Sequence, residues 1–332
     1  MTLIGARVKM TSKDRQVKHE MIGSAIGILG KRTTRKQWLE RRRSGIGASE
    51  IAAVMGVSPY SSRFSLWWEK REGWTHEETE SMRHGTGLED YVAKEFASIH
   101  PELRIVKPIS KLYMHSSYPW MLCTPDRIAY THDGSVEPVE IKTDEGGKWG
   151  KPGDENPIPQ HHYLQLFQQA AIFGARRAHL VRFAHKQITE YRFDFDWSSD
   201  KEKVLLNTIV LEADEFLASL INNEEPPPDG HKATTDTLKN LLPGIDPEIP
   251  PVPIPQGTVE EYEYWNEQKR YVKQRCAEVE NKLRHRLGRA TSGIDAFGNI
   301  FVTRTVYKRR GYEVQPTVVD QLRRKVRNDG DD

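Results

Sequence analysis

The sequence predicts a mixed α/β (α+β) protein in which a central mixed β-sheet is flanked by helices. Apolar residues recur every three or four positions on both sides of a central region, which is the helical period. Within that region they alternate with polar residues, which is the period of half-buried strands. Proline-rich segments then separate this core from a long C-terminal helix. With 37% hydrophobic and 29% charged residues, the 332-residue chain has enough apolar material to fold.

Four helices are predicted before the sheet. They cover Trp38–Arg43, Glu50–Met55, Phe64–Lys70 and Gly87–His100. The turn Gly45–Ser49 precedes the second helix, and we expect Ser49 to be its N-cap and Gly56 to end it. In the fourth helix the apolar positions run from Leu88 to Ile99 at helical spacing.

The strands and the remaining core helices follow in sequence order. The predicted strands are Lys111–His115, Trp120–Cys123, Asp126–Thr131, Val136–Thr143, Ala178–Phe183 and Ile188–Phe195. A helix at His161–Phe173 ends at Gly174 and separates the fourth strand from the fifth, and a helix at Asp200–Leu220 closes the core.

Four segments describe the predicted domain organisation. Residues 1–33 read as a basic, flexible arm, residues 34–222 as the core domain, and residues 223–256 as a proline-rich linker with a short helix at Ala233–Leu242. Residues 257–332 contain a long helix, a β-hairpin and a basic tail. The elements predicted there are a helix at Thr258–Gly288, a hairpin at Ile294–Tyr307 and a last helix at Pro316–Arg327.

The charge is uneven along the chain although the net charge is only +2. Residues 1–43 hold twelve Lys and Arg against three acidic residues, and residues 303–327 hold eight against two. Such clusters often follow a phosphate backbone. For residues 1–30 a solvated tail is the alternative, and the more favoured one.

Cysteine content and hydropathy exclude several classes. Two cysteines, Cys123 and Cys276, exclude a disulfide framework and a four-cysteine zinc or iron–sulfur site built from this chain. The chain contains no run of 18 apolar residues, so no membrane-spanning helix is predicted. Residues 21–30 are faintly like the apolar part of a secretory signal, but they are glycine-rich and lack a small-residue cleavage site, so we expect no secretion.

The most informative residues are Asp126 and, fourteen positions later, the segment Glu140–Lys142. Alternate strand residues share a face, so Glu140 and Lys142 point to one side while Ile141 points into the core. Asp126 opens the neighbouring strand and can reach the same place. Two adjacent carboxylates attract a divalent cation such as Mg²⁺ or Mn²⁺. A lysine beside it can orient water and offset charge on a phosphate, as metal-assisted phosphodiester hydrolysis requires.

Glu89 and Gln165 are further candidates. Glu89 lies near the buried flank of the preceding helix and could reach a metal, and Gln165 lies on the helix that follows the sheet. A solvated strand face is the alternative for the Glu140–Lys142 pair, and a surface amide is the alternative for Gln165.

Four separated blocks together resemble a known family. They are Trp38–Glu50, Gly85–Glu89, Thr124–Asp126 with Glu140–Lys142, and Tyr163–Gln168. In order and spacing they are similar to the YqaJ-type viral recombinase family, the group of phage lambda exonuclease, within the PD-(D/E)XK nuclease superfamily. The resemblance covers about residues 35–220 and implies a PD-(D/E)XK, restriction-endonuclease-like core with a helical and hairpin C-terminal extension.

The resemblance implies a Mg²⁺-dependent 5′-to-3′ exonuclease on linear double-stranded DNA, acting in phage-type recombination. Mn²⁺ would substitute for Mg²⁺. The implied metal ligands are Asp126, Glu140, Glu89 and the backbone carbonyl of Ile141. Lys142 is implied as the catalytic lysine, and Gln165 as a residue near the site.

The 5′ phosphate of DNA has its own implied residues. The resemblance assigns this role to Arg42 and Ser49, with Arg43 as the second candidate and Thr124 where the family often has serine or alanine. Backbone N–H groups of Gly45 and Gly47 at a helix start, together with an arginine, would suit an anion.

The resemblance also implies partners. These are double-stranded DNA ends, a phage single-strand annealing protein that receives the 3′ overhangs, and further copies of the chain in a trimer. It implies the cytoplasm of a bacterial host. Iron–sulfur relatives need four cysteines, so no such cluster is expected.

Three alternatives remain open. A structure- or site-specific endonuclease on the same fold would cut closed circles. A non-catalytic DNA-end-binding protein would bind DNA without cutting, and intact Asp126, Glu140 and Lys142 argue against it. An RNA-directed nuclease is the third, although no aromatic-rich RNA-binding signature is evident. For residues 256–332 two roles remain equally open. This region either adds contacts to DNA or to another subunit, or it packs on the core domain.

Overall fold

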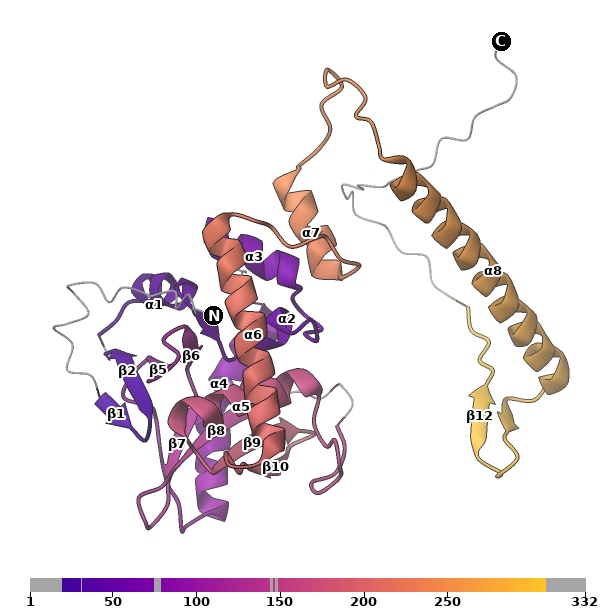
Figure 1. The fold of residues 1–332 in the computed structure, drawn as a ribbon. Helices are drawn as coiled ribbons and strands as arrows, with labels where there is room; N and C mark the ends of the chain where they lie inside the picture. The colour runs from indigo at the N-terminus through magenta and orange to yellow at the C-terminus, as the bar shows by residue number, and fades with distance from the viewer. Residues whose placement is uncertain (1–19, 31, 75–78, 144–145, 147–148, 309–332) are drawn as a thin grey trace. The chain divides into compact units, whose positions relative to one another are not determined.

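A computed structural model describes residues 20–30, 32–74, 79–143, 146 and 149–308. The chain forms two compact units, residues 1–241 and residues 242–332 (Figure 1). The predicted helix at Pro316–Arg327 lies outside the described residues. Of the helices in the described ranges, none combines the length and the apolar composition that crossing a bilayer requires.

The first unit is built on a mixed five-stranded sheet, which confirms the predicted fold class. Its strand order is β10-β9-β8-β7-β4. The strands are β4 (Arg104–Val106), β7 (Arg127–Tyr130), β8 (Val136–Lys142), β9 (Arg177–Ala184) and β10 (Gln187–Asp194). Strands β8 and β9 run parallel, and every other neighbouring pair is antiparallel. The helix between β8 and β9 makes this parallel crossover possible.

A second sheet has the order β1-β2-β5-β6-β3. Its strands are β1 (Glu20–Ile22), β2 (Ala25–Leu29), β3 (Ile46–Gly47), β5 (Leu112–His115) and β6 (Met121–Cys123). The expectation of a flexible arm is therefore wrong for residues 20–29, which form a hairpin. Buried Ile22, Ala25 and Ile28 fix it to the core. The Ser24 backbone N–H also donates to the Phe173 carbonyl at 3.2 Å.

Helix α5 (Gln160–Phe173) packs against strands of both sheets. Most of its side chains are buried, and its Gln168 amide donates to the carbonyls of Ile46 and Leu122 at 2.9 and 3.0 Å. Gly174 ends the helix with a φ of 60°. Because α5 contacts both sheets, its side chains can bring groups from the two sheets together.

Helix α4 (Glu80–Ile99) covers the opposite face of the first sheet. Its Val92 and Phe96 pack with Val139, Ile141 and Val181 of the strands. This confirms the predicted alternation along β8, with Ile141 turned to the core. The helix begins seven residues before the expected start, because the Thr79 side chain caps it.

The other helices of this unit are α1 (Arg35–Arg43), α2 (Ile51–Val54), α3 (Arg63–Glu72), α6 (Asp200–Asn222) and α7 (Lys232–Leu241). The predicted cap of α2 is wrong: its N-cap residue is Glu50, without a side-chain cap, and the Ser49 hydroxyl accepts from Arg42 instead. Helix α7 was expected within a linker, but Thr234 donates to Ser62 at 2.7 Å and fastens it to α3.

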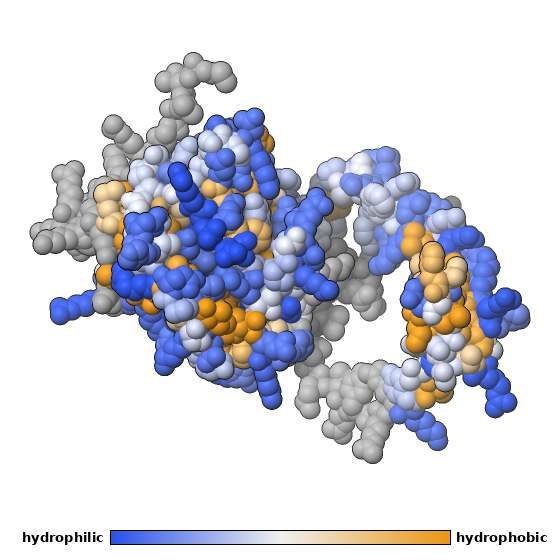
Figure 2. Space-filling view, turned by 90° about the horizontal axis from the view of Figure 1, so that it is seen from below, coloured by the Kyte–Doolittle hydropathy of each residue, from blue (hydrophilic) through white to orange (hydrophobic). Residues whose placement is uncertain are grey.

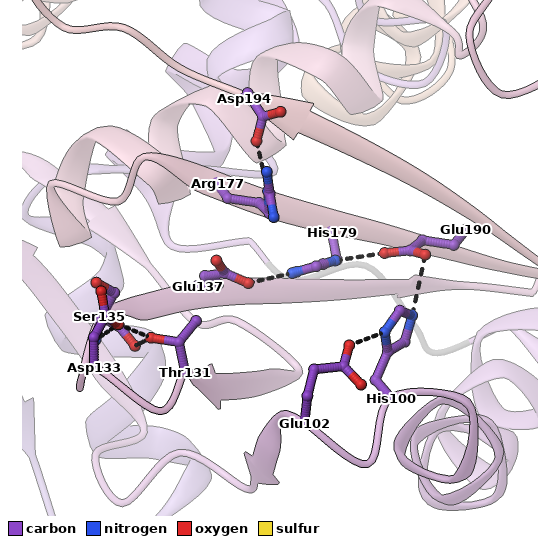
Figure 3. A network of polar contacts seen from close by, with 10 residues as sticks. All are labelled: His100, Glu102, Thr131, Asp133, Ser135, Glu137, Arg177, His179, Glu190 and Asp194. Carbon is purple, nitrogen blue, oxygen red and sulfur yellow. Dashed lines mark hydrogen bonds and ion pairs between the residues drawn. The ribbon is translucent and has the colours of Figure 1, made fainter.

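A chain of polar side chains, buried at His179 and Glu137, crosses the α4 face of the sheet (Figure 3). His179 of β9 bonds to Glu137 of β8 and Glu190 of β10, each at 2.7 Å. Glu190 continues to His100 at 3.1 Å, and His100 to Glu102 at 2.7 Å. Since both ring nitrogens of His179 face carboxylates, the charged, doubly protonated form suits the site. The chain joins three strands to the end of α4.

The second unit contains α8 (Gln256–Leu287) and the hairpin of β11 (Ser292–Ile294) and β12 (Ile300–Thr303). The predicted long helix and hairpin are both present. None of the α8 residues is buried.

Candidate active site

Two acidic residues meet where β7 begins and β8 ends. Asp126 directly precedes β7, and its Oδ2 accepts a hydrogen bond from the Ile141 backbone N–H at 2.7 Å. Glu140 and Lys142 lie on the opposite face of β8 from Ile141, as the strand period predicted. The antiparallel pairing of β7 with β8 thus brings Asp126 beside the Glu140–Lys142 segment.

Glu140 is buried and held by three donors. Lys142 Nζ donates to its Oε1 at 2.7 Å, and the Gln165 amide donates to the same oxygen at 2.6 Å. The Gln169 amide donates to Oε2 at 2.6 Å. Lys142 also donates to Gln165 Oε1 at 3.0 Å. The surface-amide alternative for Gln165 is therefore wrong, because this side chain faces the cluster from α5.

The pKa values of Asp126, Glu89 and Lys142 are all raised, so the cluster favours bound protons or a cation. Burial and the neighbouring Glu140 charge raise the pKa of Asp126 well above its usual range, despite the Ile141 hydrogen bond. Burial and Glu140 likewise raise the pKa of Glu89 on α4, against the opposing charge of Arg127. Burial alone would lower the pKa of Lys142, but Glu140 and Asp126 outweigh it and raise that pKa. Lys142 is therefore a cation, suited to stabilising negative charge rather than accepting a proton.

The donor set fits a divalent cation. Asp126 and Glu140 supply buried carboxylate oxygens, which hard cations such as Mg²⁺ and Mn²⁺ prefer. Across the described ranges, no three His, Cys, Asp or Glu side chains converge as a complete metal cage. A cation here would thus also need water, backbone or phosphate oxygens, which is usual for Mg²⁺.

A cavity of about 200 Å³ opens beside this cluster. Its lining residues are Trp38, Arg42, Gly47, Ala48, Ser49, Leu112, Cys123, Thr124, Gln165 and Gln169. Arg42 lies with its guanidinium carbon 5.0 Å from the Trp38 ring centroid and donates to the Ser49 hydroxyl at 2.6 Å. Gln165 and Gln169 belong both to this lining and to the contacts of Glu140. The cavity and the carboxylate–lysine cluster therefore share a wall.

Glu50 positions Arg42. Its Oε1 lies 3.0 Å from Arg42 Nε, and its Oε2 accepts from Lys70 Nζ at 2.8 Å and from the Gly47 N–H at 2.7 Å. Burial works against the charge of this carboxylate, but Arg42 and Lys70 outweigh it and lower the pKa of Glu50. The expectation that Gly47 offers its N–H to an anion is therefore wrong, since Glu50 occupies it.

Of the two remaining candidates for the 5′ phosphate, Thr124 lies at the cavity and Arg43 does not. The Arg43 guanidinium donates to the Lys70 carbonyl at 2.9 Å and the Arg71 carbonyl at 2.9 Å, at the end of α3. The structure thus does not bring Arg43 to the cavity. Thr124 lines the cavity, and its hydroxyl donates to the Lys111 carbonyl at 3.0 Å.

Three residues at the site were missed from the sequence. Gln169 follows Gln165 by four positions and therefore shares its helix face, which is a signal that could have found it. Glu50 follows Gly47 by three positions, but that spacing is too common to predict a contact. Lys70 lies twenty residues from Glu50, and no local pattern joins the two.

Comparison with known proteins agrees with this architecture. Residues 37–176 match the family of the YqaJ-like viral recombinase domain. The uncharacterized protein YqaJ of Bacillus subtilis is 24% identical over 269 residues, covering 78% of this chain and 80% of that protein. The resemblance inferred from the four sequence blocks is thereby confirmed: residues 37–176 are similar to the YqaJ-like viral recombinase domain.

Solved structures of exonucleases are also similar. An alkaline exonuclease from Laribacter hongkongensis matches at 20% identity and a TM-score of 0.44, covering 62% of this chain and all of that one. A phage-related exonuclease from Haemophilus somnus matches at 10% identity and a TM-score of 0.38, covering 59% of this chain and 96% of that one. The similarity to the YqaJ-like viral recombinase domain rests on the sequence matches and not on these structures.

Proposed function

We propose that this protein is a metal-dependent deoxyribonuclease that degrades linear double-stranded DNA from its 5′ ends. The observation that carries the proposal is the shared wall formed by Gln165 and Gln169. On one side lies an arginine–serine cavity of a size for a terminal phosphate, and on the other the Glu140–Lys142 pair. An enzyme that removes nucleotides from a DNA end requires a site for the terminal phosphate next to the site of hydrolysis.

Each residue then has a role. Asp126 and Glu140, with Glu89 nearby and the Ile141 carbonyl as a further donor, would hold Mg²⁺ or Mn²⁺. Bound there, the cation would supply Lewis-acid polarisation of the phosphate and a more acidic water. Lys142 stabilises charge that develops on the scissile phosphate.

Arg42, Ser49 and Thr124 receive the terminal 5′ phosphate. Arg42 is preorganised for this by Glu50 and by Trp38, so little side-chain freedom is lost when the anion binds. The products would be 3′ single strands, which a phage annealing protein would use in the cytoplasm of a bacterial host.

The test is digestion of an end-labelled linear duplex beside a covalently closed circle, both in Mg²⁺, with 5′-phosphate and 5′-hydroxyl ends compared. Loss of nucleotides from phosphorylated 5′ ends, with the circle intact, supports the proposal. Cutting of the circle would indicate the endonuclease alternative. Binding of DNA without cleavage would indicate the non-catalytic alternative, and degradation of RNA alone the RNA-directed one.

The metal requirement has its own test. EDTA should abolish cleavage, and Ca²⁺ should support DNA binding without cleavage, because its looser coordination positions water poorly. Efficient cleavage in Ca²⁺ would contradict the assigned mechanism. The trimer implied by the family resemblance is tested separately, by the mass of the chain in solution.

A further inference from the structure

The long helix α8 exposes an apolar stripe. Tyr262, Trp265, Val272 and Val279 are 44%, 60%, 55% and 50% exposed, although each is large and hydrophobic. None of the 32 residues of α8 is buried. In Figure 2, where orange marks hydrophobic residues, orange surface gathers on this unit, at the right of the view. Contiguous apolar surface of this kind marks an interaction site.

The stripe has the spacing of a coiled-coil seam. Alternating steps of three and four residues connect Tyr262, Trp265, Lys269, Val272, Cys276, Val279 and Leu283. A seam that repeats every seven residues faces a partner helix along its whole length. This pattern favours another helix as the occupant, rather than a flat protein surface or a nucleic acid.

The charge along α8 favours an identical helix in the opposite direction. Residues 256–271 hold four glutamates against Lys269 and Arg270, a net charge of −2. Residues 272–287 hold five Lys and Arg against Glu278 and Glu280, a net charge of +3. Antiparallel pairing sets the acidic half of each helix against the basic half of the other. Parallel pairing would set like charges together.

Lys269 gives a second reason for the direction. It occupies a seam position, so a parallel pair in register would place two Lys269 side chains against each other in the interface. An antiparallel pair centred near Val272 places Lys269 against valine positions of the other helix, where its alkyl stem can pack and its ammonium group can reach water. A single lysine in a seam thereby selects one orientation over another.

We propose that α8 is a self-association element, which pairs antiparallel with α8 of a second copy of this chain. The aromatic end of the stripe, Tyr262 and Trp265, then covers the aliphatic end, Val279 and Leu283, of the other copy. The pairing would join two nuclease units through their C-terminal units. It is independent of the proposed nuclease activity, because no residue of the candidate active site takes part.

The first test is the mass of the full-length chain in solution, by light scattering or sedimentation. Val272→Glu places a charge in the seam and should halve the mass of the assembly. Gln274→Glu is the matched control, since it adds the same charge two residues away on the outer face and should leave the mass unchanged. Trp265→Ser is a second seam variant, which should also reduce the mass.

The second test reports the direction. In a Cys276→Ser background, Lys273→Cys places a thiol beside the seam near the middle of the helix, where antiparallel copies meet. Oxidation should link these chains into disulfide dimers. The unmodified chain should not link through Cys276, which faces a different residue of the partner in the antiparallel pair.

Any one of the following outcomes would overturn the proposal. A monomeric chain would show that the stripe is covered by the same molecule. A mass unaffected by Val272→Glu would show that another surface joins the copies. If this variant also bound DNA more weakly without a change in mass, α8 would be a DNA-contacting element. Efficient oxidative linking through Cys276, abolished by Cys276→Ser, would show parallel pairing.

Discussion

At the scale of single residues, Glu140 is the centre of the candidate active site. It is 4% exposed, yet both carboxylate oxygens are satisfied by Lys142, Gln165 and Gln169. A buried carboxylate is stable only when it is hydrogen-bonded and paired in this way. The same contacts fix the orientation of its carboxylate.

Replacing Lys142 should separate chemistry from binding. Lys142→Met keeps the length of the side chain and removes the charge that we propose stabilises the reacting phosphate. We expect the cleavage rate to fall by about 10²- to 10³-fold, the typical cost of removing one group that stabilises transition-state charge. Binding of duplex DNA in Ca²⁺, measured by gel shift, should change little. Cleavage within a few-fold of the unmodified enzyme would contradict the role of Lys142.

Replacing Arg42 should remove the preference for a phosphorylated end. A hydrogen bond to a charged group contributes about 1.5–3 kcal/mol, so Arg42→Ala should reduce the preference for 5′-phosphate over 5′-hydroxyl ends by about ten- to a hundredfold. Lys36→Ala removes the same charge from an exposed position of α1 and serves as the control. An unchanged ratio of the two digestion rates in Arg42→Ala would place the 5′ phosphate elsewhere.

Metal binding should be visible without turnover. A cation that binds the folded protein alone raises the thermal midpoint in proportion to the logarithm of its concentration. Mg²⁺ should therefore raise the midpoint of the unmodified chain. Asp126→Asn can still accept the Ile141 hydrogen bond but supplies no negative charge, so the Mg²⁺ response should be lost. An equal response in both proteins would exclude Asp126 as a ligand.

At the scale of elements, strand β8 separates two environments. One face carries Glu140 and Lys142 towards α5, and the other carries Glu137, Val139 and Ile141 towards α4. The period of two in the sequence predicted this division. The local pattern around Ser49 was misleading, because a four-residue helix offers little dipole and the nearby Arg42 competes for the same hydroxyl.

The chain of side chains around His179 should make stability depend on pH. Burial would lower the pKa of His179, but the hydrogen bonds and charges of Glu137 and Glu190 outweigh it and raise that pKa above its ordinary value. The hydrogen bond from His179 lowers the pKa of Glu190. Phe96 of α4 and His100, directly after that helix, lie against the same ring.

His179 therefore contributes its full stabilisation below about pH 6.5, the ordinary value for histidine, and loses it as pH rises through the raised pKa. Glu190 contributes above its ordinary pKa and loses the contribution as pH falls through the lowered one. His179→Gln should lower the thermal midpoint most between about pH 5 and 6.5, and the difference should shrink at alkaline pH. Thermal unfolding of both proteins from pH 4.5 to 9.5 measures this. A difference that grows towards high pH would contradict the charged form of His179.

At the scale of the whole molecule, the two units differ in how they are stabilised. Residues 1–241 contain the two sheets and three clusters of buried apolar side chains, whereas α8 has no buried residue. The first unit therefore has what it needs to fold alone, and the second exposes apolar side chains along α8.

Deleting residues 256–332 should preserve the nuclease unit. We expect digestion of linear DNA to continue, because the shared wall and its two sites lie entirely in the first unit. If α8 serves self-association, the salt dependence of duplex binding should also be unchanged, since each lost phosphate contact would reduce the slope. Measuring duplex binding from 50 to 300 mM salt tests this. A clearly shallower dependence of the binding constant on salt concentration would show that the deleted residues contact DNA.

Much of this protein follows from local patterns. Hydrophobic periodicity predicted helices α1 to α7 and strands β5 to β10, but it missed the short strands β3 and β4. The spacing of Asp126, Glu140 and Lys142 predicted the carboxylate–lysine cluster. These succeed because the faces of helices and strands depend on neighbours only a few residues away. The hairpin at residues 20–29 was missed because its strands are short and next to a basic run, and its stability comes from the distant helix α5.

The remaining features needed the tertiary structure. That Gln169 holds Glu140, that Glu50 and Lys70 position Arg42, and that Arg43 instead caps α3 all depend on contacts between segments distant in the chain. Burial decides which of several similar side chains binds a given partner, since a buried charge must be paired whereas an exposed one need not be. Local sequence assigns a residue to the face of an element, but only the packing of the elements determines which faces meet.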